Sequence, residues 1–238
     1  MAFPSTRRSI VRAVGSADRD ERARAFDALV AAYWRPVYRC LRARYRLEEA
    51  DAEDLTQGFF AAALEKDTLA GFDPARGRFR TYLLTCLHGY AANVRRAARR
   101  QKRGGEAARV SLDAEDEGGL PALKIADEQG LEALFEREWA RSLFTLGVDG
   151  LRERCLGTPR EVAFRLFERY DLEDGDSARP TYATLATEHG LPETQVTNHL
   201  AWARREFRAA VLRRLREITA SDEEFRSEAR SLLGVDPR

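Results

Sequence analysis

The sequence is short of the residues that build metal centres and disulfide frameworks. Its 238 residues include three cysteines and three histidines. Cys40, Cys86 and Cys155 lie far apart, are odd in number and form no CxxC pair. We therefore expect buried thiols in a reducing cytoplasm rather than a disulfide framework. From the same scarcity we expect that the protein has no metal site and no cofactor.

Membrane segments and strand patterns are also missing. No apolar run approaches the roughly 20 residues that a membrane span needs, and residues 1–12 lack the apolar centre of a signal peptide. We expect a cytoplasmic protein. No stretch alternates Val, Ile and Thr with polar residues, whereas the helix formers Ala, Arg, Glu and Leu are abundant. The sequence therefore predicts an all-α fold.

The chain length and the positions of glycine and proline predict two helical domains. A chain of 238 residues is long enough to bury two separate cores. Gly104-Gly105 ends a long basic helix, and an acidic stretch with Gly118-Gly119 and Pro121 follows it. We place the first domain at residues 1–105, an acidic linker at 106–130, a second domain at 131–217, and a C-terminal helix and tail at 218–238.

Two helices joined by a tight turn are predicted between Tyr182 and Arg216. Gly190 supplies the positive φ that ends the first helix, and Pro192 suits the start of the second because its missing N–H is not needed there. The second helix has one apolar and one polar face, as in a DNA-binding helix-turn-helix. An ordinary pair of bundle helices is the alternative. The polar face carries the candidate DNA-contacting residues Glu193, Thr194, Thr197, Asn198, Ala201, Arg204 and Arg205.

The net charge of +1 conceals an uneven distribution. Ten basic residues stand against one acid between Arg76 and Arg109, and six arginines against one acid between Leu200 and Arg216. Between these runs, Ser111 to Ala140 carries nine acids against two bases. A single charged run is usually a solvated surface. Two basic surfaces, one of them on the predicted helix-turn-helix, favour two nucleic-acid contacts.

Aromatic and basic residues are interleaved where the long basic helix begins. Aromatic faces beside guanidinium groups can hold an unstacked base and its phosphates. Tyr82 and Tyr90 share an apolar stripe with Leu83 and Leu87, so we favour core positions for these two tyrosines. For Phe72 and the arginines of the loop we favour nucleic-acid contact. The interleaved residues are Phe72, Arg76, Arg78, Phe79, Arg80 and Tyr82.

A helix that begins near Glu49 carries acids in its first turns, where they interact favourably with the positive end of the helix dipole. Paired carboxylates can also belong to an active site. No histidine lies nearby in the sequence and no metal-ligand spacing is present, so the pattern does not favour an enzyme. Leu55, Phe59 and Phe60 place large apolar groups on more than one side of the helix, which favours a protein-binding surface.

These motifs resemble, in order, those of bacterial RNA polymerase sigma factors. The run Asp51–Phe60 (DAEDLTQGFF) resembles the core-binding helix of sigma region 2, and Gly77–Arg96 resembles the helix that melts the promoter and reads the minus-ten element. Tyr182–Arg208 resembles region 4, which reads the minus-thirty-five element. Two such domains with none between them resemble the extracytoplasmic-function (ECF) class. One subgroup of that class is similar at Thr6–Ser9 and Tyr33–Pro36.

The resemblance implies a dissociable, non-enzymatic polymerase subunit that directs promoter recognition and transcription initiation. Region 2 would dock on the clamp helices of the largest polymerase subunit, and region 4 would touch the flap of the second-largest subunit. The acidic linker would lie near the active-site cleft. An anti-sigma factor is a further partner that the family allows. The polymerase-binding residues would be Asp51, Asp54, Leu55, Gln57 and Phe60, and the minus-ten DNA-binding residues Phe72, Arg76, Arg78, Phe79, Arg80, Tyr82, His88, Asn93 and Arg96.

Several positions depart from the sigma-factor pattern and leave the promoter sequence open. A stand-alone helix-turn-helix regulator that binds an operator as a dimer is the alternative, but it gives the acidic helix no task. The departures are Tyr82 for the usual tryptophan, His88-Gly89 for a frequent Arg-Asn pair, and Thr197, His199 and Trp202 at positions that are commonly basic.

A last helix is predicted after the second domain. Ser221 and Glu224 form a capping box, and Gly234 can close the helix. A helix this short is marginal alone, so its apolar stripe needs a partner. We expect residues 222–233 to pack on the second domain. A polymerase or anti-sigma contact and a frayed, solvated tail are the alternatives.

Overall fold

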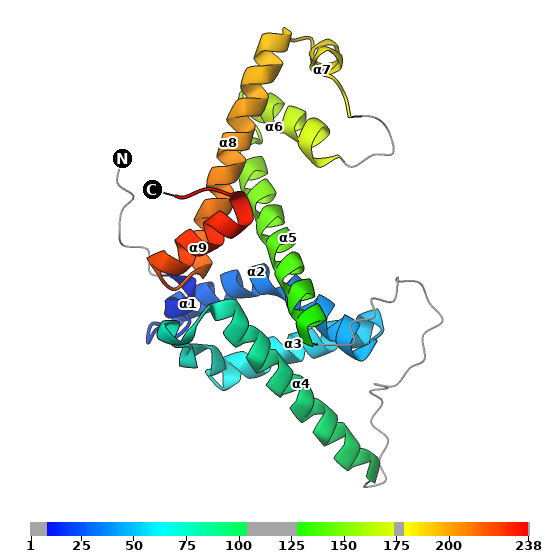
Figure 1. The fold of residues 1–238 in the computed structure, drawn as a ribbon, viewed down its shortest axis with the longest axis vertical. Helices are drawn as coiled ribbons and strands as arrows, with labels where there is room; N and C mark the ends of the chain where they lie inside the picture. The colour runs from blue at the N-terminus through cyan, green and yellow to red at the C-terminus, as the bar shows by residue number, and fades with distance from the viewer. Residues whose placement is uncertain (1–8, 104–127, 174–178, 238) are drawn as a thin grey trace. The chain divides into compact units, whose positions relative to one another are not determined.

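The computed structural model describes residues 9–103, 128–173 and 179–237, and within these ranges the chain forms helices and no strand (Figure 1). The predicted all-α fold is confirmed. The chain divides into two compact units. The first comprises Met1–Ser142 and Arg216–Arg238, and the second comprises Leu143–Leu215. The boundaries fall inside helices α5 (Glu128–Cys155) and α8 (Glu193–Ile218), each of which contributes residues to both units.

The boundary between the units differs from the predicted one. Residues 131–142 and 216–217 belong to the first unit, although we assigned them to the second domain. The reason is the packing of α5: Phe135 stacks on Tyr33 with ring centroids 6.3 Å apart, and Trp139 lies 4.6 Å from the Arg80 guanidinium. Of the predicted acidic linker, residues 106–127 lie outside the described residues, as do Thr6, Arg7 and Arg8.

The first unit is built from helices that succeed one another with short connections. Asp18 begins α2, because its carboxylate accepts hydrogen bonds from the backbone N–H groups of Asp20 at 2.9 Å and Glu21 at 3.1 Å. Arg46, with a φ of 49°, ends it. The elements are α1 (Ile10–Ala13), α2 (Arg19–Tyr45), α3 (Glu49–Glu65), the 3-10 turns η1 (Thr68–Gly71) and η2 (Pro74–Arg76), α4 (Phe79–Arg103), the first part of α5, and α9 (Asp222–Leu233).

An aromatic core joins the helices of the first unit. Tyr33 of α2 is only 1% exposed, and its ring centroid lies 5.6 Å from that of Phe79 on α4. Phe135 of α5 stacks on the same Tyr33 ring, and Phe59 of α3 is also buried. Because Phe79 is the first residue of α4, this core fixes where that helix begins.

The second unit packs α6 (Glu161–Phe167), the π turn η3 (Glu168–Leu172) and α7 (Tyr182–His189) around α8. Thr181 begins α7 by accepting a hydrogen bond from the Thr184 N–H at 3.1 Å, and Gly190 ends it with a φ of 63°. α8 starts directly after Pro192, as predicted. Its apolar stripe is buried in a core that contains Leu151, Cys155, Phe164, Leu166, Phe167, Leu185, Val196, Leu200 and Ala203.

α9 forms as predicted but packs on a different partner. The Glu224 N–H donates to Ser221 Oγ at 3.1 Å, and Gly234 ends the helix with a φ of 62°. The expectation that α9 packs on the second domain is wrong: it belongs to the first unit, where Glu224 accepts a hydrogen bond from the Phe79 N–H at 3.2 Å. Carboxylates facing the basic start of α4 select this partner.

The cysteines are free thiols. Cys40 and Cys155 are buried, as predicted, and Cys86 is half-buried. Burial raises the pKa of the Cys40 thiol to about 12 and raises the pKa of Cys155 above its usual value. In the described ranges, no three His, Cys, Asp or Glu side chains are grouped as metal ligands would be. No helix there combines the length and apolar character that crossing a membrane requires.

Gly58 of α3 leaves room for a side chain of α4. A methyl group at position 58 would stand 2.5 Å from the Tyr90 hydroxyl oxygen. We predict that Gly58→Ala lowers the free energy of unfolding by about 1–2 kcal/mol, because overpacking costs more than the gain in helix propensity returns. Thermal melting followed by circular dichroism measures this change.

Tyr90→Phe isolates the cause. In that background Gly58→Ala is expected to be neutral or stabilising, because the nearest remaining atom is Tyr90 Cζ at 3.7 Å. Gly89→Ala on α4 is the control: nothing lies within 4 Å of a methyl group there, so it should stabilise by about 1 kcal/mol. Equal destabilisation by Gly58→Ala in both backgrounds would contradict the proposed contact.

Candidate nucleic-acid interface

The acidic side of α3 is open to solvent. Glu49 and Asp51 occupy its first turn, where unpaired backbone N–H groups favour negative charge. Asp54 and Gln57 are exposed, and Asp51 and Leu55 are half-buried. Residues three and four apart are neighbours on a helix surface, so Asp51, Asp54, Leu55 and Gln57 form one continuous patch. We call this patch the acidic α3 face.

Phe60, the fifth predicted polymerase-binding residue, lies in the core. It is 3% exposed and stacks on Trp34 with ring centroids 5.9 Å apart. Phe26 and Phe59 approach the same ring at 6.3 Å and 5.2 Å. Phe60 therefore supports the acidic α3 face from behind and offers no surface of its own. No local pattern indicates this, because both faces of α3 contain apolar residues.

The loop before α4 carries a cluster of three aromatic rings. Phe72 lies 5.2 Å from Phe79 and 5.5 Å from Tyr82 between ring centroids. Phe79 is buried, whereas Phe72 and Tyr82 are half-buried. The Tyr82 hydroxyl donates to the Thr68 carbonyl oxygen at 2.6 Å, which ties α4 to η1. Phe72 and Tyr82 thus present partly exposed ring surface from fixed positions.

The three arginines around this cluster have different environments. The Arg76 side chain is 88% exposed, although its Nε lies 3.6 Å from Asp73. Arg78 is 44% exposed, and Arg80 only 7%. Arg80 is enclosed between carboxylates, with its Nε 2.8 Å from Glu136 Oε1 and its Nη1 donating to Glu228 Oε2 at 2.6 Å. In this arrangement Arg80 presents no surface to a DNA strand.

The remaining predicted residues of α4 lie further along the helix. Asn93 follows Tyr82 by eleven positions, and Arg96 follows Asn93 by three. These spacings place the three residues on the same side of the helix. Asn93 and Arg96 are exposed, and the Arg96 guanidinium donates to Asn93 Oδ1 at 2.8 Å. His88 is half-buried. The aromatic cluster is therefore continued by a polar strip along α4.

The polar face of α8 is exposed as predicted. Thr197 and Asn198 stand at its centre, with the Thr197 hydroxyl donating to the Glu193 carbonyl oxygen at 3.0 Å. Trp202, at the edge of this face, is half-buried and lies 4.7 Å from the Arg160 guanidinium. The exposed residues are Glu193, Thr194, Thr197, Asn198, Ala201 and Arg205.

Arg204 differs from its neighbours because its guanidinium, although 41% of the side chain is exposed, is bound by a carboxylate of the same unit. Its Nε donates to Asp171 Oδ2 at 2.8 Å and its Nη2 donates to Asp171 Oδ1 at 3.0 Å. Tyr170 lies 5.3 Å from the same guanidinium, and Arg179 approaches the same partners, donating to Asp171 at 2.6 Å. The hydrogen bonds to Asp171 raise the pKa of Arg204 above the usual value for arginine. Sequence reasoning missed Tyr170 and Asp171, which stand more than thirty positions before Arg204 of α8.

The comparison with known protein families matches one segment of the chain. Residues 29–103, which run from α2 to the end of α4, match the family model of sigma-70 region 2. The predicted resemblance to sigma region 2 is thereby confirmed. No curated protein and no solved structure matches the chain. The region 2 match supports a member of the sigma factor family, with a role in binding RNA polymerase and recognising promoters.

Proposed function

We propose that this protein is an ECF-class sigma factor that binds core RNA polymerase and directs it to promoters. The observation that carries the proposal is the matched region 2 segment, in which an exposed acidic helix face precedes a partly exposed aromatic cluster and a polar strip. The second unit supplies a second candidate DNA surface. In this role the protein is not an enzyme, and it acts in the cytoplasm together with the polymerase.

The acidic α3 face is the proposed polymerase contact. Asp54 and Gln57 are exposed, and Leu55 adds half-buried apolar surface between them. A patch with an apolar centre and charged neighbours suits a specific protein contact, because the apolar part contributes affinity and the charges select the partner. We assign it to the clamp helices of the largest polymerase subunit.

The aromatic cluster and the strip along α4 are the proposed minus-ten contact. Stacking of a base on an aromatic ring contributes about 1–3 kcal/mol, which offsets much of the cost of unstacking that base from DNA. Phe72 and Tyr82 offer such ring surface, and Arg76 and Arg78 are the nearby exposed cations. We assign phosphate contacts to these two arginines and leave Arg80 out because it is buried.

The helix pair α7–α8 is the proposed minus-thirty-five contact, acting as a helix-turn-helix. Its exposed Thr197 and Asn198 are suited to base edges, and Arg205 to a phosphate. The same unit would touch the flap of the second-largest polymerase subunit. An anti-sigma factor is a further partner that this proposal accommodates.

The first test of this proposal concerns the acidic α3 face. Asp54→Arg is expected to weaken association with core polymerase at least about tenfold, because a like charge placed in a complementary contact costs several kcal/mol. Co-migration with core polymerase in gel filtration without DNA measures the association. A stand-alone operator-binding regulator would show no co-migration at all.

Two further variants make the result specific. Glu65→Arg makes the same charge change at the exposed end of the same helix, away from the acidic α3 face, and should bind like the natural chain. Phe60→Ala should lower the free energy of unfolding by about 3–5 kcal/mol, as expected for a buried aromatic residue. Undiminished binding by a folded Asp54→Arg variant contradicts the assignment of this face.

A second test concerns base recognition by α8. Asn198→Ala is expected to change the preferred upstream sequence, since one base-edge contact discriminates by about 1–3 kcal/mol. Selection from random DNA by the polymerase holoenzyme measures the preference. An unchanged sequence preference would show that the exposed face of α8 does not read bases at this position.

The adjacent arginines Arg204 and Arg205 should behave differently. Arg205→Ala is expected to lower the salt dependence of DNA binding, by about 0.9 in the slope of log K against log salt, as loss of one phosphate contact requires. Arg204→Ala is expected to lower the melting temperature, because it removes two hydrogen bonds to Asp171. Identical effects of both changes on salt dependence and melting would contradict this division.

A further inference from the structure

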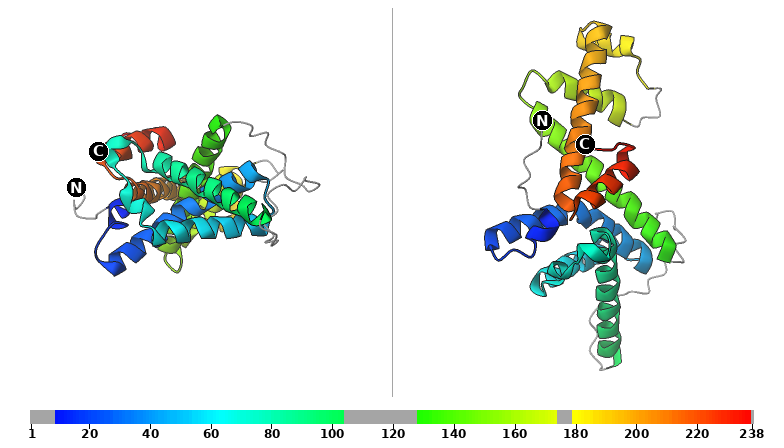
Figure 2. Two further views of the ribbon diagram at one scale, coloured as in Figure 1. Left: turned by 90° about the horizontal axis from the view of Figure 1, so that it is seen from below. Right: turned by 60° about the vertical axis from the view of Figure 1, so that its left-hand side comes forward.

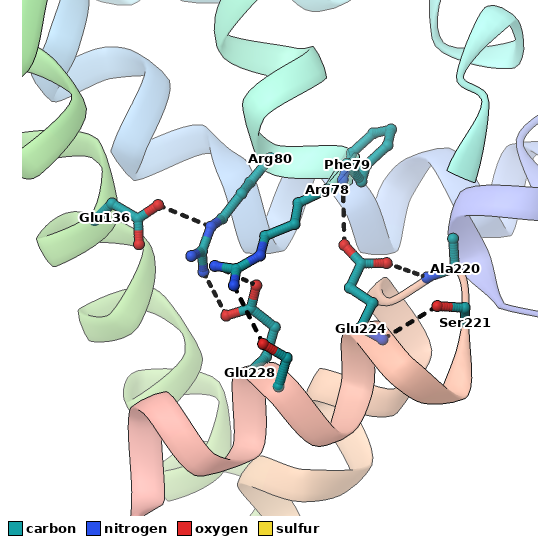
Figure 3. A network of polar contacts seen from close by, with 9 residues as sticks. Arg78, Phe79, Arg80, Glu136, Ala220, Ser221, Glu224 and Glu228 are labelled. Carbon is teal, nitrogen blue, oxygen red and sulfur yellow. Dashed lines mark hydrogen bonds and ion pairs between the residues drawn. The ribbon is translucent and has the colours of Figure 1, made fainter. Parts of the chain in front are cut away.

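The start of α4 is occupied by carboxylates of α9 (Figure 3). Glu224 accepts the Phe79 N–H at 3.2 Å and the Ala220 N–H at 2.7 Å, so it bridges α4 and the connection before α9. One turn later, Glu228 accepts from Arg80 at 2.6 Å and lies 3.4 Å from the Arg78 guanidinium. The two carboxylates of α9 therefore accept hydrogen bonds from Phe79 and Arg80 of α4 and form an ion pair with Arg78, which directly precedes that helix.

The groups that contact Glu224 and Glu228 at the start of α4 are of the kind that binds anions. The N–H groups in the first turn of a helix have no partner within that helix and favour negative charge. Phe79 contributes such a group, and Arg78 adds a guanidinium of the kind that binds carboxylates and phosphates alike. A nucleic-acid strand passing the aromatic cluster offers the same chemistry as Glu224 and Glu228.

The attachment of α9 combines ion pairs with partial apolar burial. Glu228 and Ala229 are its buried residues, whereas Phe225, Leu232 and Leu233 are only half-buried. Segments whose apolar side chains are incompletely buried open at a lower free-energy cost than the core of a domain. Salt and polyanions also weaken contacts of this kind more than they weaken apolar packing.

Release of α9 leaves no buried charge without a partner. Arg80 keeps Glu136 at 2.8 Å and the Trp139 ring at 4.6 Å, both on α5. Glu228 would become solvated, and Arg78 is already 44% exposed. The large penalty for breaking a buried ion pair arises when one charge stays behind unpaired, and that condition is not met here.

We propose that α9 is an internal competitor for DNA, whose Glu224 and Glu228 cover Phe79 N–H and Arg78 until a nucleic-acid strand displaces them. This inference rests on the proposed function, since it assumes that the start of α4 meets DNA. It makes the free protein a weaker DNA binder than its basic residues alone would allow.

The experiment uses the full chain and a short fluorescein-labelled single-stranded DNA of mixed sequence, with binding followed by anisotropy over a range of salt. Glu224→Gln and Glu228→Gln are expected to bind more tightly at low salt. Each additional phosphate that the variant neutralises should steepen the salt slope by about 0.7, so that a fourfold dilution of salt tightens binding about 2.6-fold more than for the natural chain.

Glu223→Gln is the matched control, because Glu223 is exposed on the same helix and the charge change is identical. Amide exchange of residues 222–233 in the natural chain provides a second readout and should accelerate when the DNA is added. Folded variants that bind with the affinity and salt slope of Glu223→Gln overturn the proposal. Unchanged exchange at saturating DNA, or loss of folding in both variants, also overturns it by making α9 a fixed part of the unit.

Failure of this inference is separable from failure of the proposed function. Association with core polymerase is measured in the same preparations through the acidic α3 face, which lies on a different helix from the α9 contact. A chain that binds polymerase while its Glu224 and Glu228 variants show no increase in DNA affinity refutes only the role of α9. A chain that binds neither polymerase nor promoter DNA refutes the proposed function itself.

Discussion

The burial of Phe79 is the contact on which the surfaces of the first unit depend. Phe79 begins α4 and is enclosed by Tyr33 of α2 and Phe72 of the preceding loop. Burying an aromatic side chain of this size contributes about 1.5–3 kcal/mol, enough to fix the rotation of the helix start. Arg78 and Arg80 flank it, and the guanidinium groups of both reach Glu228 of α9 (Figure 3). Arg80 also contacts Glu136 of α5 and is 7% exposed, whereas Arg78 stays 44% exposed.

Much of the local structure follows directly from the sequence. Gly190 and Pro192 mark the turn between α7 and α8, and the apolar residues of α8 at helical spacing are the buried ones. The capping box at Ser221 also forms where the sequence predicts it. Such features depend on residues within one or two turns of each other, so a local pattern contains the information that determines them.

The environments of Phe60, Arg80 and Arg204 could not be read in this way. Phe60 meets a ring of α2, Arg80 meets carboxylates of α5 and α9, and Arg204 meets Asp171 of η3. Each partner lies 26 to 148 positions away in the sequence. A run of arginines looks uniformly basic in sequence, but the tertiary fold decides which of them are neutralised. The same limitation placed α9 against the wrong domain, because its carboxylates and not its apolar stripe select its partner.

The ring of Tyr90 has a mechanical consequence for the first unit. It reaches from α4 to the backbone of α3 at Gly58 and packs against Phe59 at 5.6 Å between ring centroids. Sliding of α4 along α3 would press this ring against the neighbouring turn of α3, so Tyr90 opposes that movement. Figure 2 shows the two helices from two further directions. This ring is therefore one contact through which a displacement of the acidic α3 face would reach the polar strip of α4.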